Sequence, residues 1–290
     1  MNSIYPFPPT DPTEQPNGNS DRKVFSVLTL IIAALAIFCL LALVALVVLR
    51  IVPLGNDSPL PEDTQDTQSN TDDLPSSLTP ADVMLQETAD AGLEYIGKMV
   101  FIGESTTSHL SSRPGLPIQA AQVWKDSSGT KRLSSRITSE KILCNGSEMT
   151  IAEACALEKP EYVVLSFGLN GIIDFIANKN SYTSNYSKLI KAIQAASPET
   201  RIILQTVYPV SSADDFSVDL ATLNGYIMTL NEWIPEIAAA HDGVRVVDTA
   251  SVLRTVDGVL GSAYDVGDGI HLTANTYVAV LDYLRTHAWQ

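Results

Sequence analysis

The 290-residue chain has few cysteines and no cluster of basic residues. Cys39 lies in an apolar run, which leaves only Cys144 and Cys155, too few for a scaffold built on disulfide bonds. An extracellular location would still permit one bridge between these two, and neither has a histidine at metal-ligand spacing. The net charge is -15, whereas a protein that binds nucleic acid needs clustered Lys and Arg to neutralise phosphates. These absences exclude a disulfide-built domain and a nucleic-acid-binding protein.

Charged residues are also absent from a long apolar run near the N-terminus, residues 24–49. At about 1.5 Å of rise per residue, a helix of this length crosses a hydrocarbon core of about 30 Å. A cleaved signal peptide has an apolar region of only about 7 to 15 residues. Arg22 and Lys23 precede the run and Arg50 alone follows it, which favours a cytoplasmic N-terminus. We therefore predict a single-pass transmembrane anchor at residues 24–52, with the C-terminal part outside the cytoplasm.

The predicted anchor separates two segments that have little apolar surface to bury. Residues 1–23 are rich in Pro, Asn, Thr and Asp, which predicts a disordered cytoplasmic tail. Residues 53–80 hold five prolines, six acidic residues and no basic residue, which predicts an extended, self-repelling linker. The rest of the chain, residues 81–290, has a length typical of one α/β domain.

Apolar runs alternate with helical patterns along this domain. Short strands buried on both faces are predicted at 99–102, 162–165, 201–205 and 244–247. Segments with helical spacing lie at 150–158, 183–196 and 220–240, and Thr273 is placed to cap a last helix that ends near residue 286. The alternation predicts a three-layer α/β/α fold with a mainly parallel, flavodoxin-like sheet. Ligands bind such sheets at the carboxyl ends of the strands.

Three short blocks with reactive side chains lie at these positions. Gly-Glu-Ser ends at Ser105, directly after the first strand, where a hydroxyl is either a nucleophile or a helix cap. Gly-Leu-Asn ends at Asn170, whose amide would donate to an oxyanion or simply form an Asn-Gly turn. Asp268 and His271 stand three residues apart before the last helix, and they supply the acid and the base that a serine nucleophile needs.

In this order and spacing, the blocks resemble those of the SGNH hydrolases, also called GDSL-type esterases and lipases, over about residues 97–290. The resemblance, to a membrane-anchored bacterial member, implies that Ser105 is the nucleophile and His271 the base, with Asp268 orienting the imidazole.

The resemblance also implies an oxyanion hole formed by the Ser105 amide, the Asn170 side chain and the amide of a glycine between the first two blocks. Gly129 is the first choice for this glycine and Gly146 is the alternative.

The sequence departs from the family pattern at two positions. Glu104 stands before the serine where members usually have Asp, and Gly171 follows Asn170 where Asp is also usual. Neither change removes a catalytic group, but both are expected to alter how the loops of the site are held.

The remaining histidines and one tyrosine are open to structural interpretations. His109 either lines the entrance to the site or packs in a loop. His241 fits a helix end, where an imidazolium suits the helix dipole, and His287 fits a structural role near the C-terminus. Tyr208, which precedes Pro209 after the third strand, either shapes the pocket or packs in the core.

Together these features predict an extracytoplasmic serine esterase that acts through an acyl-enzyme, without a metal or cofactor. By analogy with the family, an outward-facing, anchored domain suits small-molecule or glycan esters, such as O-acetyl groups on cell-surface glycans. An acyltransferase that uses the same triad and an inactive binding module with the same fold stay open as alternatives. The oligomeric state does not follow from the sequence.

Overall fold

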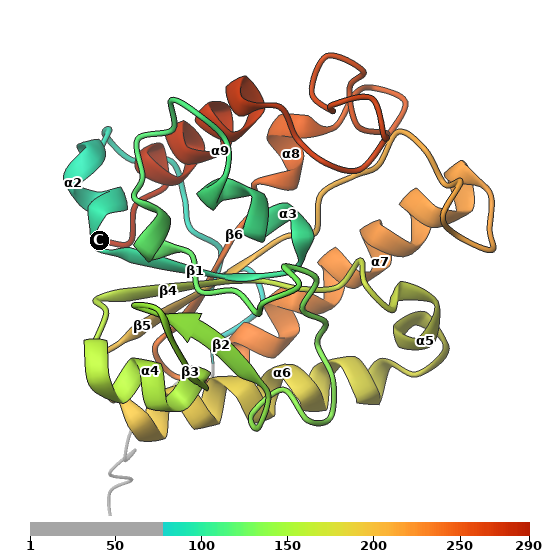
Figure 1. The fold of residues 1–290 in the computed structure, drawn as a ribbon. Helices are drawn as coiled ribbons and strands as arrows, with labels where there is room; N and C mark the ends of the chain where they lie inside the picture. The colour runs from blue at the N-terminus through green and yellow to red at the C-terminus, as the bar shows by residue number, and fades with distance from the viewer. Residues whose placement is uncertain (1–77) are drawn as a thin grey trace, which may run out of the picture. The chain divides into compact units, whose positions relative to one another are not determined.

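The structure is a computed structural model that describes residues 78–290 (Figure 1). The predicted tail at 1–23, the predicted anchor at 24–52 and nearly all of the predicted linker at 53–80 lie outside the described residues. Within residues 78–290, no helix combines the length and the apolar character needed to cross a membrane.

Four parallel strands form the main sheet in the spatial order β1-β4-β5-β6. These strands are β1 (Met99–Gly103), β4 (Tyr162–Ser166), β5 (Arg201–Gln205) and β6 (Val244–Val247). All four strands predicted from the apolar runs are therefore confirmed, each to within one residue at its ends. A separate antiparallel hairpin, β2 (Lys141–Cys144) and β3 (Ser147–Thr150), is not predicted by those runs.

Helices cover both faces of the sheet, which gives the predicted three layers (Figure 1). One face carries α2 (Gly92–Gly97), α3 (Ser105–Ser108), α8 (Ala250–Leu253) and α9 (Ala274–Thr286). The other face carries α4 (Ile151–Glu158), α5 (Ile172–Ala177), α6 (Lys179–Ala196) and α7 (Leu220–Ala239). Two short 3-10 helices, His109–Ser111 and Ala120–Gln122, complete the described elements.

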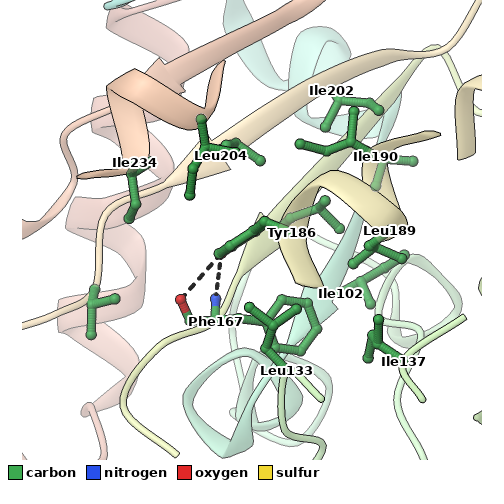
Figure 2. Packing of buried hydrophobic residues seen from close by; sticks show 14 of the residues in the cluster. Ile102, Leu133, Ile137, Phe167, Tyr186, Leu189, Ile190, Ile202, Leu204 and Ile234 are labelled. Carbon is green, nitrogen blue, oxygen red and sulfur yellow. Dashed lines mark hydrogen bonds between the residues drawn. The ribbon is translucent and has the colours of Figure 1, made fainter. Parts of the chain in front are cut away.

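The strands contribute side chains to two hydrophobic cores, one on each face of the sheet, because successive side chains of a strand point to opposite faces. In β4, Tyr162 and Val164 join the cluster that includes residues of α2 and α9, whereas Val163 and Leu165 join the cluster under α4, α6 and α7. Figure 2 shows part of the second cluster. Burial on both faces explains why the strands read as continuous apolar runs rather than as alternating ones.

The helix bounds follow side-chain caps. α4, α7 and α9 agree with the predicted segments to within one residue or so, and Thr273 caps α9 by accepting from the Thr276 amide at 3.3 Å. α6 begins at Lys179, four residues before the predicted 183. Asn178 caps it by accepting from the Ser181 amide at 3.1 Å. The polar first turn of α6 lacks the apolar spacing on which the prediction depends.

Short segments cover both edges of the sheet. On the outer edge of β1, Val123 forms a single parallel bridge with Phe101. A flavodoxin-like sheet has a whole strand at this place, so here that strand is reduced to one bridge. On the outer edge of β6, Met84 bridges Val246 and the Leu85 amide donates to the Val246 carbonyl at 2.8 Å.

Candidate active site

Ser105 is the first residue of α3 and stands at the carboxyl end of β1. A Cβ at Gly103 would overlap the Thr107 hydroxyl and the Ser166 carbonyl, so glycine is needed for the chain to turn here. On the far side of the turn, the buried Tyr277 hydroxyl of α9 donates to the Thr106 carbonyl. The core thus fixes the backbone on both sides of Ser105.

Asp268 and His271 form a local pair on the loop before α9. Asp268 Oδ1 accepts from the amides of Ile270 at 2.9 Å and His271 at 2.8 Å, while Oδ2 lies 2.8 Å from His271 Nδ1. Partial burial acts to raise the pKa of Asp268, but these hydrogen bonds outweigh it and lower the pKa to about 2. The side chains are 47% and 23% exposed for Asp268 and His271, so the pair is solvent-accessible.

His271 Nε2 lies 2.9 Å from Ser105 Oγ, although the two residues are 166 positions apart. With the Asp268 contact, this gives an unbroken Ser105–His271–Asp268 chain of hydrogen bonds. The structure therefore brings together the three residues that the sequence motifs single out. An imidazole in hydrogen-bond reach of both a hydroxyl and a carboxylate is the arrangement that activates a serine.

Asn170 lies on a loop that Glu104 holds from inside the protein. The Glu104 carboxylate accepts from the amides of Gly168, Leu169 and Asn170 at 2.9 to 3.1 Å. Burial raises the pKa of Glu104 to about 7, although the three amides and the charge of Arg132 act to lower it. The first departure from the family pattern thus supplies the carboxylate that fixes the backbone around Asn170.

Two tyrosines of α6 support the same loop from below. The Tyr186 hydroxyl accepts from the Phe167 amide at 3.0 Å and lies 3.1 Å from its carbonyl, as Figure 2 shows. The Tyr182 hydroxyl donates to the same carbonyl at 2.9 Å. Both hydroxyls are buried, so the start of the loop is tied to the core.

The Asn170 side chain and the Gly129 amide, two of the predicted oxyanion donors, both donate to backbone carbonyls. The Asn170 side-chain amide donates to the Lys131 carbonyl in a long contact of 3.4 Å. The Gly129 amide donates to the Asp126 carbonyl at 3.2 Å, so this donor is engaged within a turn. Gly146, the alternative, lies in the turn between β2 and β3. The glycine that completes an oxyanion hole stays a prediction.

His109 packs against the catalytic candidates rather than standing apart from them. Its ring lies 4.3 Å from the His271 ring, with planes tilted by 35°. Arg113 contacts His109 Nδ1 at 3.4 Å and donates to the Leu272 carbonyl at 3.1 Å. Burial lowers the pKa of His109, and the neighbouring His271 and Arg113 lower it further.

The other two histidines lie away from these contacts. His241 follows the end of α7, where its Nε2 lies 3.0 Å from the Ser187 hydroxyl, and burial lowers its pKa, which disfavours the predicted imidazolium. His287 stacks on Tyr283 at 3.7 Å. Both histidines thus have packing roles.

Tyr208 and Pro209 line a small cavity whose other walls include Glu104, Thr106 and Ile270. The Tyr208 hydroxyl accepts from Gln205 Nε2 at 2.7 Å, so the buried tyrosine has its polar end paired while its ring shapes the cavity. The two interpretations of this tyrosine, pocket and core, therefore both apply.

Cys144 and Cys155 are free thiols and are fully buried. Over residues 78–290, no three or more His, Cys, Asp and Glu side chains gather in a group that could hold a metal ion.

Several solved structures resemble the chain at low sequence identity. A GDSL-like lipase from Bacteroides thetaiotaomicron VPI-5482 is 18% identical, with 68% of this chain and 88% of that chain covered and a TM-score of 0.43. A family 3 carbohydrate esterase from Talaromyces cellulolyticus is 14% identical, with coverage of 64% and 93% and a TM-score of 0.41. A family 3 carbohydrate esterase from Clostridium thermocellum is 15% identical, with coverage of 65% and 93% and a TM-score of 0.40.

Comparison with curated protein sequences gives no match. The family model of the GDSL-like lipases and acylhydrolases, in contrast, matches residues 101–279, more than half of the chain. The matched region runs from β1 into α9 and contains Ser105, Asn170, Asp268 and His271. The chain therefore belongs to the GDSL-like lipase/acylhydrolase family, the SGNH hydrolases.

Proposed function

We propose that this family member is a serine esterase in which Ser105 attacks the ester carbonyl. The observation that carries the proposal is the 2.9 Å contact between His271 Nε2 and Ser105 Oγ, with Asp268 bonded to the other ring nitrogen. A serine hydroxyl is a poor nucleophile until a base accepts its proton, and a carboxylate on Nδ1 keeps the imidazole in the tautomer that can accept it.

In the first half of the reaction, His271 Nε2 takes the proton from Ser105 as Oγ bonds to the carbonyl carbon. The tetrahedral oxyanion collapses, the bond to the alcohol oxygen breaks, and the alcohol leaves with the proton from His271. In the second half, His271 takes a proton from water, the hydroxide attacks the acyl-enzyme, and the acid leaves as Ser105 recovers its proton.

Charge on the carbonyl oxygen needs donors that are in place before the reaction starts. The Ser105 amide and the Asn170 side chain are the proposed donors, together with a glycine amide for which Gly129 is the first choice. The Glu104 carboxylate supports this role because it fixes the backbone of Asn170 at 3.0 and 3.1 Å.

The cavity beside the site favours a short acyl group. Its lining includes Thr106, Leu169 and Ile270, each next in the chain to a residue of the candidate site, and most of its other walls are apolar. It has room for about one water-sized group, so it does not extend the site into a channel for a long acyl chain. An acetyl ester is the proposed substrate type, and O-acetyl groups on cell-surface glycans fit it.

The proposal is tested with aryl esters and a covalent probe. The wild-type chain should hydrolyse 4-nitrophenyl acetate much faster than the octanoate, and a fluorophosphonate should label Ser105. Labelling that persists in Ser105→Ala would remove Ser105 as the nucleophile. Equal rates for wild type and His271→Ala would favour an inactive binding module, and acetate transfer to an added sugar in place of release would favour an acyltransferase.

We also propose that the domain is anchored in a membrane and faces outward. The uncharged run at residues 24–49 and the charges that flank it support this location. The chain should stay in the membrane fraction after a high-salt wash, and protease added to intact cells should cleave the domain. A chain without residues 24–52 is the control, and finding wild type in the soluble fraction would contradict the anchor.

A further inference from the structure

A guanidinium group lies against Gly171, at the side of the candidate site that carries Asn170. Cζ, Nε and a terminal nitrogen of Arg132 all lie 2.5 Å from the point that a Cβ on residue 171 would occupy. Side-chain carbons do not approach other heavy atoms this closely, and the φ of 98° at Gly171 further disfavours other residues. The missing side chain at Gly171 is thus what makes room for Arg132.

Two residues of α5 hold the guanidinium in this position. Arg132 donates to Asp174 Oδ2 at 2.6 Å, and its Cζ lies 5.7 Å from the centre of the Phe175 ring. The bond to Asp174 uses one of the five N–H donors of the guanidinium. With 47% of the Arg132 side chain exposed, the group is both positioned and accessible to a ligand.

Arg132 is close to Asn170, a proposed oxyanion donor. The Lys131 carbonyl accepts from the Asn170 side chain, so the backbone at Lys131 runs beside Asn170 and Gly171. The positive charge of Arg132 also acts on the buried carboxylate of Glu104, the residue before the nucleophile. Arg132 therefore lies at the rim of the site on the oxyanion side.

Positive charge also lies on the side of the site that carries His271. Arg113 contacts His109 Nδ1 at 3.4 Å, and the His109 ring packs against the His271 ring at 4.3 Å. Arg113 and Lys125 act to lower the pKa of His109, although Asp268 acts to raise it. Two acids of the site are already engaged, Asp268 by His271 and Asp174 by Arg132. In a chain with a net charge of -15, cations on both sides of one site favour the approach of an anion there.

We propose that Arg132 binds a carboxylate or phosphate on the alcohol part of the ester, so that the preferred substrate is an acidic ester. The inference rests on the proposed esterase function, because Arg132 would select substrates for Ser105. A guanidinium pairs two N–H donors with two oxygens of either anion, whereas a neutral sugar offers no charged partner. The anion is placed on the alcohol part, since the cavity proposed for the acyl group is small and mostly apolar.

Three acetylated sugars test the proposal and separate the two anions. They are O-acetylated methyl glucuronoside, its neutral carboxamide, and O-acetylated methyl glucoside 6-phosphate, each assayed by released acetate. A charged hydrogen bond gives about a 10- to 100-fold preference in kcat/KM for at least one acidic ester over the neutral one. The preference should weaken as salt is added, because the guanidinium is half-exposed.

Arg132→Gln should abolish the preference, mainly by raising KM for the acidic ester. Arg132→Lys keeps the charge but loses the paired donors, so it should retain only part of the preference. Arg136→Gln is the matched control, because Arg136 is an exposed arginine on the same loop and its loss changes the net charge equally. The readout is the ratio of two kcat/KM values, from which a general loss of activity cancels.

Equal kcat/KM values for the acidic and neutral esters in wild type would overturn the proposal. A preference that survives in Arg132→Gln, or that falls equally in Arg136→Gln, would also overturn it. Failure of the esterase function itself has a different signature, which is that wild type hydrolyses neither the neutral sugar ester nor 4-nitrophenyl acetate.

Discussion

Asp268 and His271 lie on an exposed loop and contact each other three residues apart, whereas a buried carboxylate holds Asn170 from 66 positions away in the sequence. The first arm of the site, Asp268 with His271, is thus locally assembled and solvent-accessible. The second arm, Glu104 with residues 168–170, is part of the core. Changes in the first arm should therefore alter catalysis far more than stability, and changes in the second should alter both.

The sharpest test of the exposed arm is Asp268→Asn. Without the carboxylate the imidazole loses its preferred tautomer, and kcat should fall by about 10⁴-fold. The free energy of unfolding should change by only about 0.5 kcal/mol, as at other accessible positions. Aryl-ester kinetics measure kcat and urea unfolding measures the free energy of unfolding. Asp257→Asn, on another exposed loop, is the control. A large loss of stability would show that the first arm also supports the fold.

Asn170→Ala separates the side chain of the second arm from its backbone. Loss of one oxyanion donor should lower kcat by about 10²- to 10³-fold. Stability should hardly change, since the side chain makes a single long contact of 3.4 Å and the Glu104 bonds go to the backbone. Less than a fivefold loss of kcat, measured with a short aryl ester, would remove Asn170 from the proposed oxyanion hole.

Glu104→Ala tests the buried arm itself. Three amides lose their acceptor, and at about 1 kcal/mol or more for each, the free energy of unfolding should fall by about 3 kcal/mol. We expect kcat to fall in the same variant, because Asn170 is no longer held. Glu94→Ala, at an exposed position of α2, is the control for losing a glutamate. Wild-type stability in Glu104→Ala would contradict the view that the second arm supports the fold.

The two carboxylates should also respond to pH with opposite sign. Glu104 has a pKa raised from 4.5 to about 7, so the folded state binds the extra proton and stability should fall as pH rises through this window, by at most about 1.4 kcal/mol per pH unit. Asp268 has a pKa lowered from 3.8 to about 2, so the stability it contributes is present above about pH 4 and is lost as pH falls toward 2.

Unfolding of wild type and Glu104→Gln, measured from pH 4 to pH 8, isolates the buried group. Because glutamine does not titrate, the difference between the two curves should slope only between about pH 4.5 and pH 7. A flat difference would mean that Glu104 keeps an ordinary pKa in the folded state.

The exposed arm can be predicted from the sequence because its partners are near neighbours with distinctive side chains. An acid three residues before a histidine predicts the Asp268–His271 pair, and apolar runs predict the buried strands. No sequence pattern predicts the Glu104 contacts, because its partners are backbone amides, which almost every residue type can supply. The position of Arg132 over Gly171 depends in the same way on how two distant loops meet.

The β2–β3 hairpin, in contrast, is indicated by its turn residues rather than by an apolar run. Asn145 and Gly146 form its two-residue turn, and both have positive φ values, of 49° and 79°. Asn-Gly is the strongest short sequence indication of such a turn. Attention to turn chemistry would therefore extend the prediction to this element.

The covered edges of the sheet bear on how the domain behaves in solution. A free strand edge presents unpaired amides and carbonyls that recruit strands from other copies and lead to aggregation. On the β6 side, Val83, Met84 and Leu85 shield the edge through a few backbone contacts with Val246. A shortened chain that begins after Leu85 would keep every residue of the candidate site and still be prone to self-association.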